Sequence, residues 1–338
     1  TQKPSVSAFG NYSHYHDSIL ETLKELVENA QSSKREIKYG MVTTISKGYD
    51  APACAAIARD LGCNKCVSFN QPVKYADDCG DDIARVLGFT EIIVKSAEQY
   101  LSNDYLIEAE FVSSGDLGTE IVFTAFENEF AGNIVFMGLR GDRVWDKNCP
   151  DSNGRFRFDN EVYASTSMIE NRLRVGYVLL PMALFGVTEW PSITKISNSL
   201  EMEPFSIGGS YDRPIPRRIV ESRGVPREMF GMKKMGAGFN YRWDNLSRIE
   251  KRMSPDSYQS FVNFVLNNRR KRIDTIVPWL RFFWSSKSQY VGYALRKVNL
   301  RYETKPVSAD ALVNPGAPSY LLPWGIHEMT KRYDIPSV

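Results

Sequence analysis

The chain has few of the residues that build histidine-centred sites. Only three histidines occur in 338 residues, at positions 14, 16 and 327. A His-rich metal centre needs several imidazoles, and a Ser-His-Asp triad needs one beside its nucleophile. We therefore expect neither kind of site. The five cysteines are an odd number in a chain too large to depend on disulfides. This favours a reducing compartment, and we expect a cytoplasmic protein.

Long apolar runs and an excess of one charge are also missing. The longest uncharged apolar run covers residues 175–187 and contains Pro181. A membrane helix needs about 20 apolar residues, so we expect no membrane partner. The 42 Lys and Arg residues nearly balance the 40 Asp and Glu residues, with a net charge of +2. This balance argues against a general polyanion binder, and we do not expect a nucleic-acid partner.

Short apolar strands alternate with helical stripes in the first half of the chain. The pattern predicts strands at 37–45, 65–69, 91–94 and 133–137, and helices at 17–30, 51–61 and 80–87. Such alternation is typical of βαβ units with a mostly parallel sheet. In these sheets, ligands bind beyond the carboxyl ends of the strands. The polar turns 46–50 and 138–142 both lie at such ends.

The second half of the chain becomes basic and helix-rich after Gly208. Residues 168–205 combine a helix with an apolar run, and further helices are predicted at 254–268, 273–285, 290–298 and between Pro323 and Tyr333. The predicted fold is a doubly wound, Rossmann-like α/β sheet with a helical C-terminal part. We expect an N-terminal extension with one helix at 1–35, the α/β domain at 36–240 and a helical region at 241–338.

The turn Ser46-Lys-Gly-Tyr-Asp-Ala51 carries the first candidate site. It joins a strand to a helix, and the N–H groups at the start of a helix suit a phosphate. Lys47 adds a positive charge, Ser46 adds a hydroxyl, and Asp50 beside an anion suggests a bridging Mg²⁺. The simpler interpretation is an ordinary βα turn in which Asp50 caps the helix.

Three segments together resemble a known family, the N-type ATP pyrophosphatases that contain a PP-loop. Ser46–Ala51 resembles their pyrophosphate loop, S-G-G-x-D-S, and Phe136–Trp145 resembles the G-x-G-x-D-E-x-F segment of the asparagine synthetase synthetase domain. Tyr211–Ile219 followed by Gly224–Lys234 resembles the family's basic helix and the lysine that faces ATP pyrophosphate. Lys233 matches that lysine best, and Lys234 is one step away. The resemblance covers residues 36–240.

The resemblance implies an adenine nucleotide alpha hydrolase-like fold and the use of ATP with Mg²⁺. Such an enzyme adenylates a carboxylate or carbonyl oxygen, releases pyrophosphate and then admits a nitrogen nucleophile. Its implied partners are a small-molecule acceptor, an amine or ammonia donor and a separate amidotransferase subunit. Lys233 and Asp142 would be catalytic, and Asp50 and Asp142 would hold the metal. The remaining cofactor-binding residues would be Ser46, Lys47, Gly48, Tyr49, Asp50, Ala51, Gly138 and Lys234.

Departures from the family motifs keep two alternatives open. Lys47 replaces a loop glycine, and Arg143 replaces an acidic residue. One alternative is an RNA- or small-molecule-modifying sulfur transferase of the same superfamily that uses Cys63, Cys66 or Cys79. The other is a degenerate protein that binds nucleotide without catalysis. Cys63-Asn-Lys-Cys66 has too few neighbouring ligands for a standard metal site, so we interpret these cysteines as isolated thiols.

Overall fold

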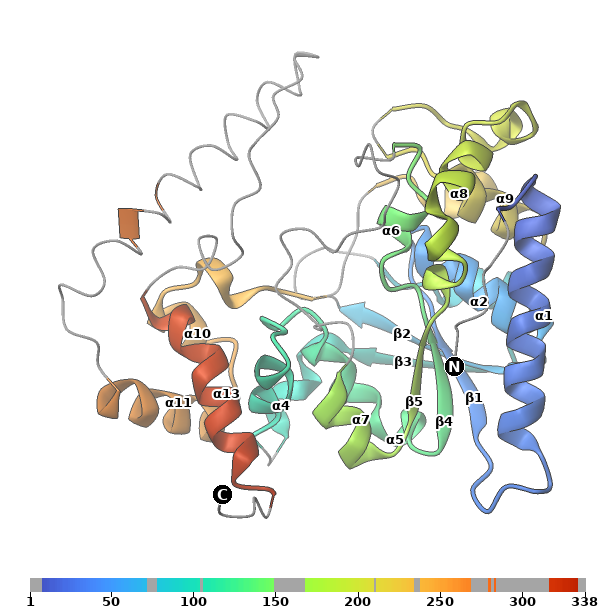
Figure 1. Cartoon of the computed structure of the whole chain (residues 1–338). Helices are drawn as coiled ribbons and strands as arrows, with labels where there is room; N and C mark the ends of the chain where they lie inside the picture. Colours follow the sequence, from blue (N-terminus) through green and yellow to red (C-terminus); the bar gives the residue numbers. More distant parts are fainter. Residues whose placement is uncertain are drawn as a thin grey trace. The chain divides into compact units, whose positions relative to one another are not determined.

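The computed structural model (Figure 1) describes residues 8–71, 78–103, 106–148, 168–209, 211–233, 238–268, 279–280, 283 and 316–333. Its contacts group the chain into two compact units. Unit 1 consists of residues 1–97, 125–157 and 172–237, and unit 2 consists of residues 98–124, 158–171 and 238–338. The predicted division at residues 35 and 240 stays a prediction.

Unit 1 contains a five-stranded sheet in which every pair of neighbours is parallel. The strands are β1 Gly40–Thr44, β2 Lys65–Gln71, β3 Glu91–Ser96, β4 Asn133–Met137 and β5 Val178–Pro181, in the spatial order β3-β2-β1-β4-β5. The predicted doubly wound, Rossmann-like α/β fold is confirmed. The fifth strand was not predicted, because its four residues lie inside an apolar run that has no clear period.

Helices precede, connect and follow the strands of unit 1. They are α1 Tyr12–Gln31, α2 Asp50–Asp60, α3 Asp81–Val86, α5 Glu127–Phe130, α6 Gly141–Val144, α8 Trp190–Ser197 and α9 Pro214–Glu221, while α7 Ile169–Val175 spans the boundary between units. Two of the predicted helix starts, those of α1 and α2, were wrong. Helix α1 begins before residue 17, because the Asn11 side chain accepts a hydrogen bond from the His14 N–H at 2.9 Å. Asp50 is the first residue of α2. Tyr49 occupies the N-cap position, and its side chain makes no capping hydrogen bond to the helix.

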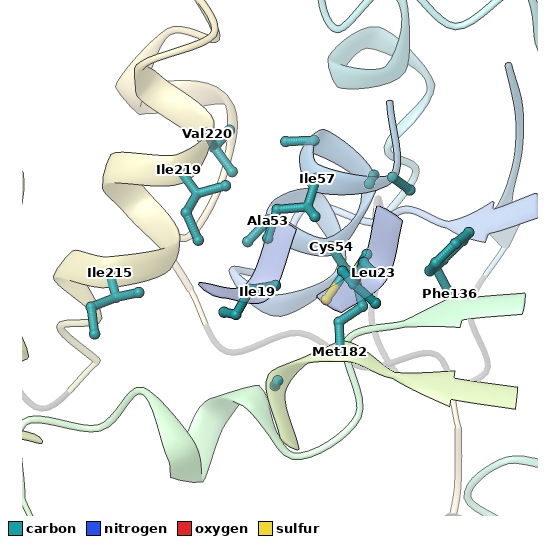
Figure 2. Close-up of a cluster of buried hydrophobic side chains, with 14 of the residues drawn as sticks. Ile19, Leu23, Ala53, Cys54, Ile57, Phe136, Met182, Ile215, Ile219 and Val220 are labelled. Carbon is teal, nitrogen blue, oxygen red and sulfur yellow. The ribbon is translucent and has the colours of Figure 1, made fainter. Parts of the chain in front are cut away.

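Both faces of the central strand β4 are buried. On β4, Ile134 and Phe136 face one side and Val135 and Met137 face the other, and all four are at most 1% exposed. The first side packs against α2, and α1 and α9 contribute to the same core (Figure 2), which has the labelled residues Ile19, Leu23, Ala53, Cys54, Ile57, Phe136, Met182, Ile215, Ile219 and Val220. Burial on both faces is typical of parallel sheets, and it leaves the strand-end loops as the places for chemistry.

Unit 2 is helical in its described residues. Its helices are α4 Ile107–Ser113, α10 Leu246–Glu250, α11 Pro255–Asn267 and α13 Leu321–Thr330. Helices α4 and α13 pack so closely that a Cβ on Gly325 would lie 2.7 Å from the Ser113 nitrogen. The helices predicted at 273–285 and 290–298 lie outside the described residues, apart from 279–280 and 283. Within the part of the chain that the structure describes, no helix has the length and apolar character to cross a membrane.

Candidate functional site

The sheet order creates a switch point between β1 and β4. The chain progresses from β1 to β2 and β3 on one side of β1, and then continues with β4 and β5 on the other side. At such a point, neighbouring connections leave the sheet in opposite directions and open a crevice at the carboxyl ends of the strands. The turns that follow β1 and β4 lie at this edge. They are the same turns that the sequence marked at 46–50 and 138–142.

Two glycines hold these turns in contact. A Cβ on Gly138 would lie 2.5 Å from the Asp50 carbonyl carbon and 2.6 Å from the Ala51 nitrogen. A Cβ on Gly141 would lie 2.6 Å from the Asp50 carboxylate oxygen Oδ1. At position 138 only glycine permits this approach, because a larger side chain would force the backbones apart, whereas at position 141 it would displace the Asp50 side chain. The structure therefore brings the Asp50 carboxylate beside the residue that precedes Asp142.

The phenol of Tyr211 interacts electrostatically with the two aspartates of this edge. Its hydroxyl lies 4.0 Å from the position of a Cβ on Gly48. Burial raises the pKa of the Tyr211 phenol, and the negative charges of Asp50 and Asp142 raise it further. Both carboxylates thus act on one phenol, although they come from α2 and α6 respectively. Asp142 is half-buried, and its carbonyl oxygen accepts a hydrogen bond from Arg213 Nε at 3.0 Å.

The turn after β1 is also joined to the segment after β2. The Lys47 N–H donates to the Asp78 carboxylate at 3.1 Å, and Ser46 forms an isolated antiparallel bridge with Cys79. Within the turn, the Gly48 N–H donates to the Ser46 hydroxyl at 3.2 Å. Two N–H groups that the sequence suggested for phosphate therefore have acceptors within the protein. Asp78 was not predicted as a site residue, although its place after a central strand was a usable signal.

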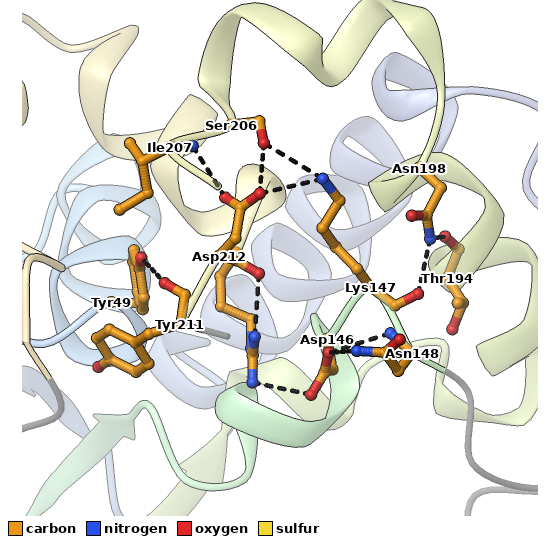
Figure 3. Close-up of polar contacts among 11 residues, drawn as sticks. Tyr49, Asp146, Lys147, Asn148, Thr194, Asn198, Ser206, Ile207, Tyr211 and Asp212 are labelled. Carbon is orange, nitrogen blue, oxygen red and sulfur yellow. Dashed lines mark hydrogen bonds and ion pairs between the residues drawn. The ribbon is translucent and has the colours of Figure 1, made fainter. Parts of the chain in front are cut away.

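A third segment, residues 211–213, is fastened to the residues after β4 (Figure 3). The Asp212 carboxylate accepts hydrogen bonds from Ser206 Oγ and Ile207 N and pairs with Lys147 Nζ at 3.0 Å. These donors lower the pKa of Asp212 even though burial by itself would raise it. Arg213 pairs with Asp146 at 2.8 Å. Ion pairs thus join the third motif segment to Asp146 and Lys147, the two residues that follow the second motif segment, and the sequence spacing alone did not show this.

The helix of the third motif, α9, buries a basic side chain in the protein instead of exposing it to solvent. Arg217 of α9 is fully buried, and its guanidinium donates to Glu221 and to the carbonyl oxygens of Arg227 and Gly231. It lies 5.4 Å from the ring centroid of Tyr49. Tyr49 is itself 1% exposed and donates from its hydroxyl to the Tyr211 carbonyl oxygen. The Tyr49 side chain therefore faces the protein core, which leaves its backbone as the part that belongs to the turn.

Lys233 lies next to a direct link with the turn. The Gly231 N–H donates to the Lys47 carbonyl oxygen at 2.8 Å, and Lys233 follows two residues later with an exposed side chain. Lys234 lies outside the described residues. Ser46, Lys47, Gly48 and Ala51 are half-buried. The structure therefore places the candidate residues of all three motifs, other than Lys234, within unit 1, on segments that contact one another.

The thiols near β2 are poorly suited to nucleophilic chemistry. Cys63 and Cys66 are buried, and burial raises the pKa of Cys63 to about 11 and of Cys66 to about 12. Cys79 is half-buried, its pKa is also raised by burial, and its Sγ contacts Asp81 Oδ1 at 3.2 Å. A thiolate is the reactive form, and these positions disfavour it. Among the described residues, no group of three or more His, Cys, Asp or Glu side chains is arranged to hold a metal.

A cavity of about 600 Å³ lies in unit 2 and contains none of the motif residues. Its lining comes from α11, α13 and the residue after each, and most of the lining residues are of polar types: Asp256, Gln259, Ser260, Asn263, Phe264, Asn267, Asn268, His327, Glu328 and Lys331. Glu328 accepts hydrogen bonds from Ser260 and Lys331. The bond from Ser260 joins α11 to α13, whereas the pair with Lys331 lies at the end of α13 itself.

Comparisons with known proteins identify no family. No family model matches the chain, and no curated protein matches it. One solved structure with detectable similarity comes from Methanocaldococcus jannaschii and is described as a predicted subunit of tRNA methyltransferase. It shares 17% identity, covers 59% of this chain and 95% of its own, and has a TM-score of 0.27. The sheet itself therefore defines what the chain is: a doubly wound, Rossmann-like α/β protein whose strand-end turns meet at the β1/β4 switch point.

Proposed function

We propose that the carboxyl edge of the sheet binds ATP with Mg²⁺ and that the protein is an AMP-forming ligase or transferase. The observation that carries this proposal is the contact between the two strand-end turns. Gly138 and Gly141 seat the turn after β4 against Asp50, at the switch point where doubly wound sheets bind ligands. The three motifs that resemble the N-type ATP pyrophosphatases meet at the same edge.

The residues present fit a magnesium nucleotide by their donor chemistry. Mg²⁺ prefers oxygen ligands and is usually held by one or two carboxylates together with substrate phosphates. Asp50 and Asp142 would supply these carboxylates. Lys47 and Lys233 would supply positive charge toward the phosphates, where negative charge develops as pyrophosphate leaves. Bound Mg²⁺–ATP would supply an activated adenylyl group for a carboxylate or carbonyl oxygen of the acceptor.

The chain's own residues would position and screen this chemistry. The close packing of Gly138 on α2 fixes the spacing of the two turns. The ion pair between Arg213 and Asp146 attaches residues 211–213 to the segment after β4. Tyr211 is protonated at neutral pH, as a tyrosine with the ordinary pKa of about 10 also is, and burial raises its pKa further, so its hydroxyl can donate a hydrogen bond to an anion. The proposed partners are a small-molecule acceptor and an amine or ammonia donor, with an amidotransferase subunit as the source of ammonia.

A second candidate is a nucleotide-binding protein without catalysis. It is favoured by the hydrogen bonds that the turn already makes, because the N–H group of Lys47 donates to Asp78 of the segment after β2 and that of Gly48 donates to Ser46. The sulfur-transfer alternative has less support, since the nearby thiols have raised pKa values. Release of pyrophosphate from ATP, measured with a panel of carboxylate acceptors and ammonia, separates the ligase from the non-catalytic binder.

Calorimetric titration with Mg²⁺ and a non-hydrolysable ATP analogue tests the proposed site. We expect Asp50→Ala and Lys233→Ala each to weaken binding about ten- to a hundredfold, since a charged hydrogen-bond partner contributes about 1.5–3 kcal/mol. Matched controls are Asp82→Ala and Lys24→Ala, whose parent side chains are exposed on α3 and α1. Unchanged affinity in both site variants, or the absence of binding to the wild type, would refute the proposal.

Lys47→Gly restores the glycine of the family motif and tests whether Lys47 supports or obstructs the binding of ATP. If Lys47 contacts phosphate, its removal should weaken binding of the ATP analogue. If ATP binds only to the variant, Lys47 obstructs the site and the natural protein is not an ATP enzyme. Circular dichroism of each variant should match the wild type, so that a change in affinity reflects the site and not the fold.

A further inference from the structure

Asp78 places a carboxylate where an anionic ligand of the turn would bind. It is 4% exposed, and its Oδ1 atom accepts the Lys47 N–H at 3.1 Å. Lys47 and Asp78 are 31 residues apart and follow neighbouring strands, so this contact depends on the parallel sheet. A backbone N–H in a strand-to-helix turn suits an anion, and here the protein itself supplies one.

The segment that carries Asp78 is clamped on the turn. Cys79 bridges Ser46, and the Gly80 N–H donates to Ser68 Oγ at 2.9 Å. The Ser68 hydroxyl in turn donates to the Ile45 carbonyl oxygen at 2.9 Å. The fit is tight, because a Cβ on Gly80 would lie 2.8 Å from the Ser46 nitrogen. This clamp, residues 78–80, holds the carboxylate against the turn.

We propose that Asp78 is an internal competitor of phosphate, which must leave the Lys47 N–H before a pyrophosphate or polyphosphate group can occupy the turn. This inference rests on the proposed function for the location of the phosphates. A phosphate oxygen and the carboxylate would use the same N–H donor, and two anions on one donor also repel each other. The clamp therefore lowers the affinity of the turn for phosphate ligands and selects against weakly charged ones.

Titration with inorganic pyrophosphate and Mg²⁺ tests this competition without ATP. Asp78→Asn keeps an oxygen acceptor of similar shape but removes the charge, so pyrophosphate should bind about tenfold more tightly, or better, than to the wild type. Asp82→Asn is the control, since it removes the same charge from an exposed residue of the next helix. Equal or weaker binding to Asp78→Asn than to the wild type would overturn the inference, as would the same gain in the control.

A second variant addresses the clamp and leaves the carboxylate in place. Gly80→Ala would press its methyl group on the Ser46 backbone and push segment 78–80 away from the turn. It should also tighten pyrophosphate binding, and the amide resonance of Lys47 should shift as its acceptor changes. If the amide resonance of Lys47 is unchanged in both Asp78→Asn and Gly80→Ala, Asp78 does not occupy the Lys47 N–H, and the competition is contradicted.

The two proposals fail in different ways. If Asp78→Asn gains affinity for pyrophosphate but neither protein binds ATP, the competition stands and the proposed function is lost. If the wild type binds ATP and Asp78→Asn gains nothing for pyrophosphate, the competition is lost and the proposed function stands.

Discussion

Two aspartates, one in each unit, accept backbone N–H groups in a turn. In unit 2, Asp116 accepts the N–H groups of Gly118 and Thr119 at 2.8 Å each and that of Glu120 at 3.0 Å. In unit 1, Asp78 accepts the Lys47 N–H at 3.1 Å. The donors to Asp116 lie two to four residues away, whereas the donor to Asp78 lies 31 residues away.

The difference in sequence separation indicates different roles. The three bonds to Asp116 close one local turn, so the carboxylate completes the backbone of its own segment. The bond to Asp78 joins two strand-end segments at the edge where a parallel sheet binds ligands. A carboxylate that satisfies its own turn has little freedom to exchange partners. One that bridges two segments can exchange its N–H partner for a ligand when the segments separate.

The largest expected effect is on the stability of unit 2. Asp116→Ala removes the acceptor of three N–H groups, and each buried donor left without a partner costs about 1–3 kcal/mol. We expect a loss of at least about 3 kcal/mol in the free energy of unfolding. Urea denaturation followed by circular dichroism measures it. A shift no larger than that of the exposed control Asp82→Ala would show that the local turn does not depend on Asp116.

A smaller loss is expected where the two turns of unit 1 meet. Gly138→Ala introduces a methyl group 2.5 Å from the Asp50 carbonyl carbon. Overpacking of this kind costs about 1–3 kcal/mol, and it should also separate Asp50 from the turn after β4. Gly10→Ala is the matched control, because no atom lies within 4 Å of its Cβ position. Equal midpoints of urea unfolding for the two variants would mean that the turns are not closely packed.

Asp78→Ala should destabilise the protein less than Asp116→Ala does. This change removes a long-range hydrogen bond to one N–H, so the loss of stability should be about 1 kcal/mol, less than for Asp116→Ala. The same denaturation assay measures both. If Asp78→Ala is the more destabilising of the two, Asp78 is a structural residue, and its proposed exchange with phosphate becomes untenable.

The smallest effect at neutral pH concerns the thiols. With a pKa of about 11, Cys63 is about one part in a thousand thiolate at pH 8. Alkylation of the native protein, followed residue by residue by mass spectrometry, should therefore modify half-buried Cys79 before Cys63 and Cys66. Rapid modification of Cys63 at pH 8 would revive the sulfur-transfer alternative.

The raised pKa values also predict how stability depends on alkaline pH. Burial raises the pKa of Cys63 to about 11 and of Cys66 to about 12 in the folded state. Their contribution to stability is fully present below the unfolded thiol pKa of about 8.5. It is lost as the pH rises through the two folded values. Substitution of both by Ala should flatten this decline, which denaturation at several pH values measures.

Much of the fold could be predicted from local patterns. The strand at 133–137 was predicted at its observed bounds, and alternation of strands and helices predicted the parallel sheet. These features follow from side-chain periodicity, which is present in the sequence itself. The fifth strand was missed because burial on both faces removes the alternation of polar and apolar residues. The start of α1 was missed because its Asn11 cap precedes a mixed polar and aromatic segment.

The candidate site depended more on tertiary structure. The sequence by itself determined that two polar turns follow apolar strands, and that Asp50, Asp142 and Lys233 are polar residues in motif positions. Only the folded chain decided that Gly138 and Gly141 seat one turn on Asp50, that Arg217 is buried beside Tyr49, and that Asp78 accepts the Lys47 N–H. The physical reason is that periodicity and turn propensity act between near neighbours. The strand order of the sheet, by contrast, sets which distant N–H groups and carboxylates meet.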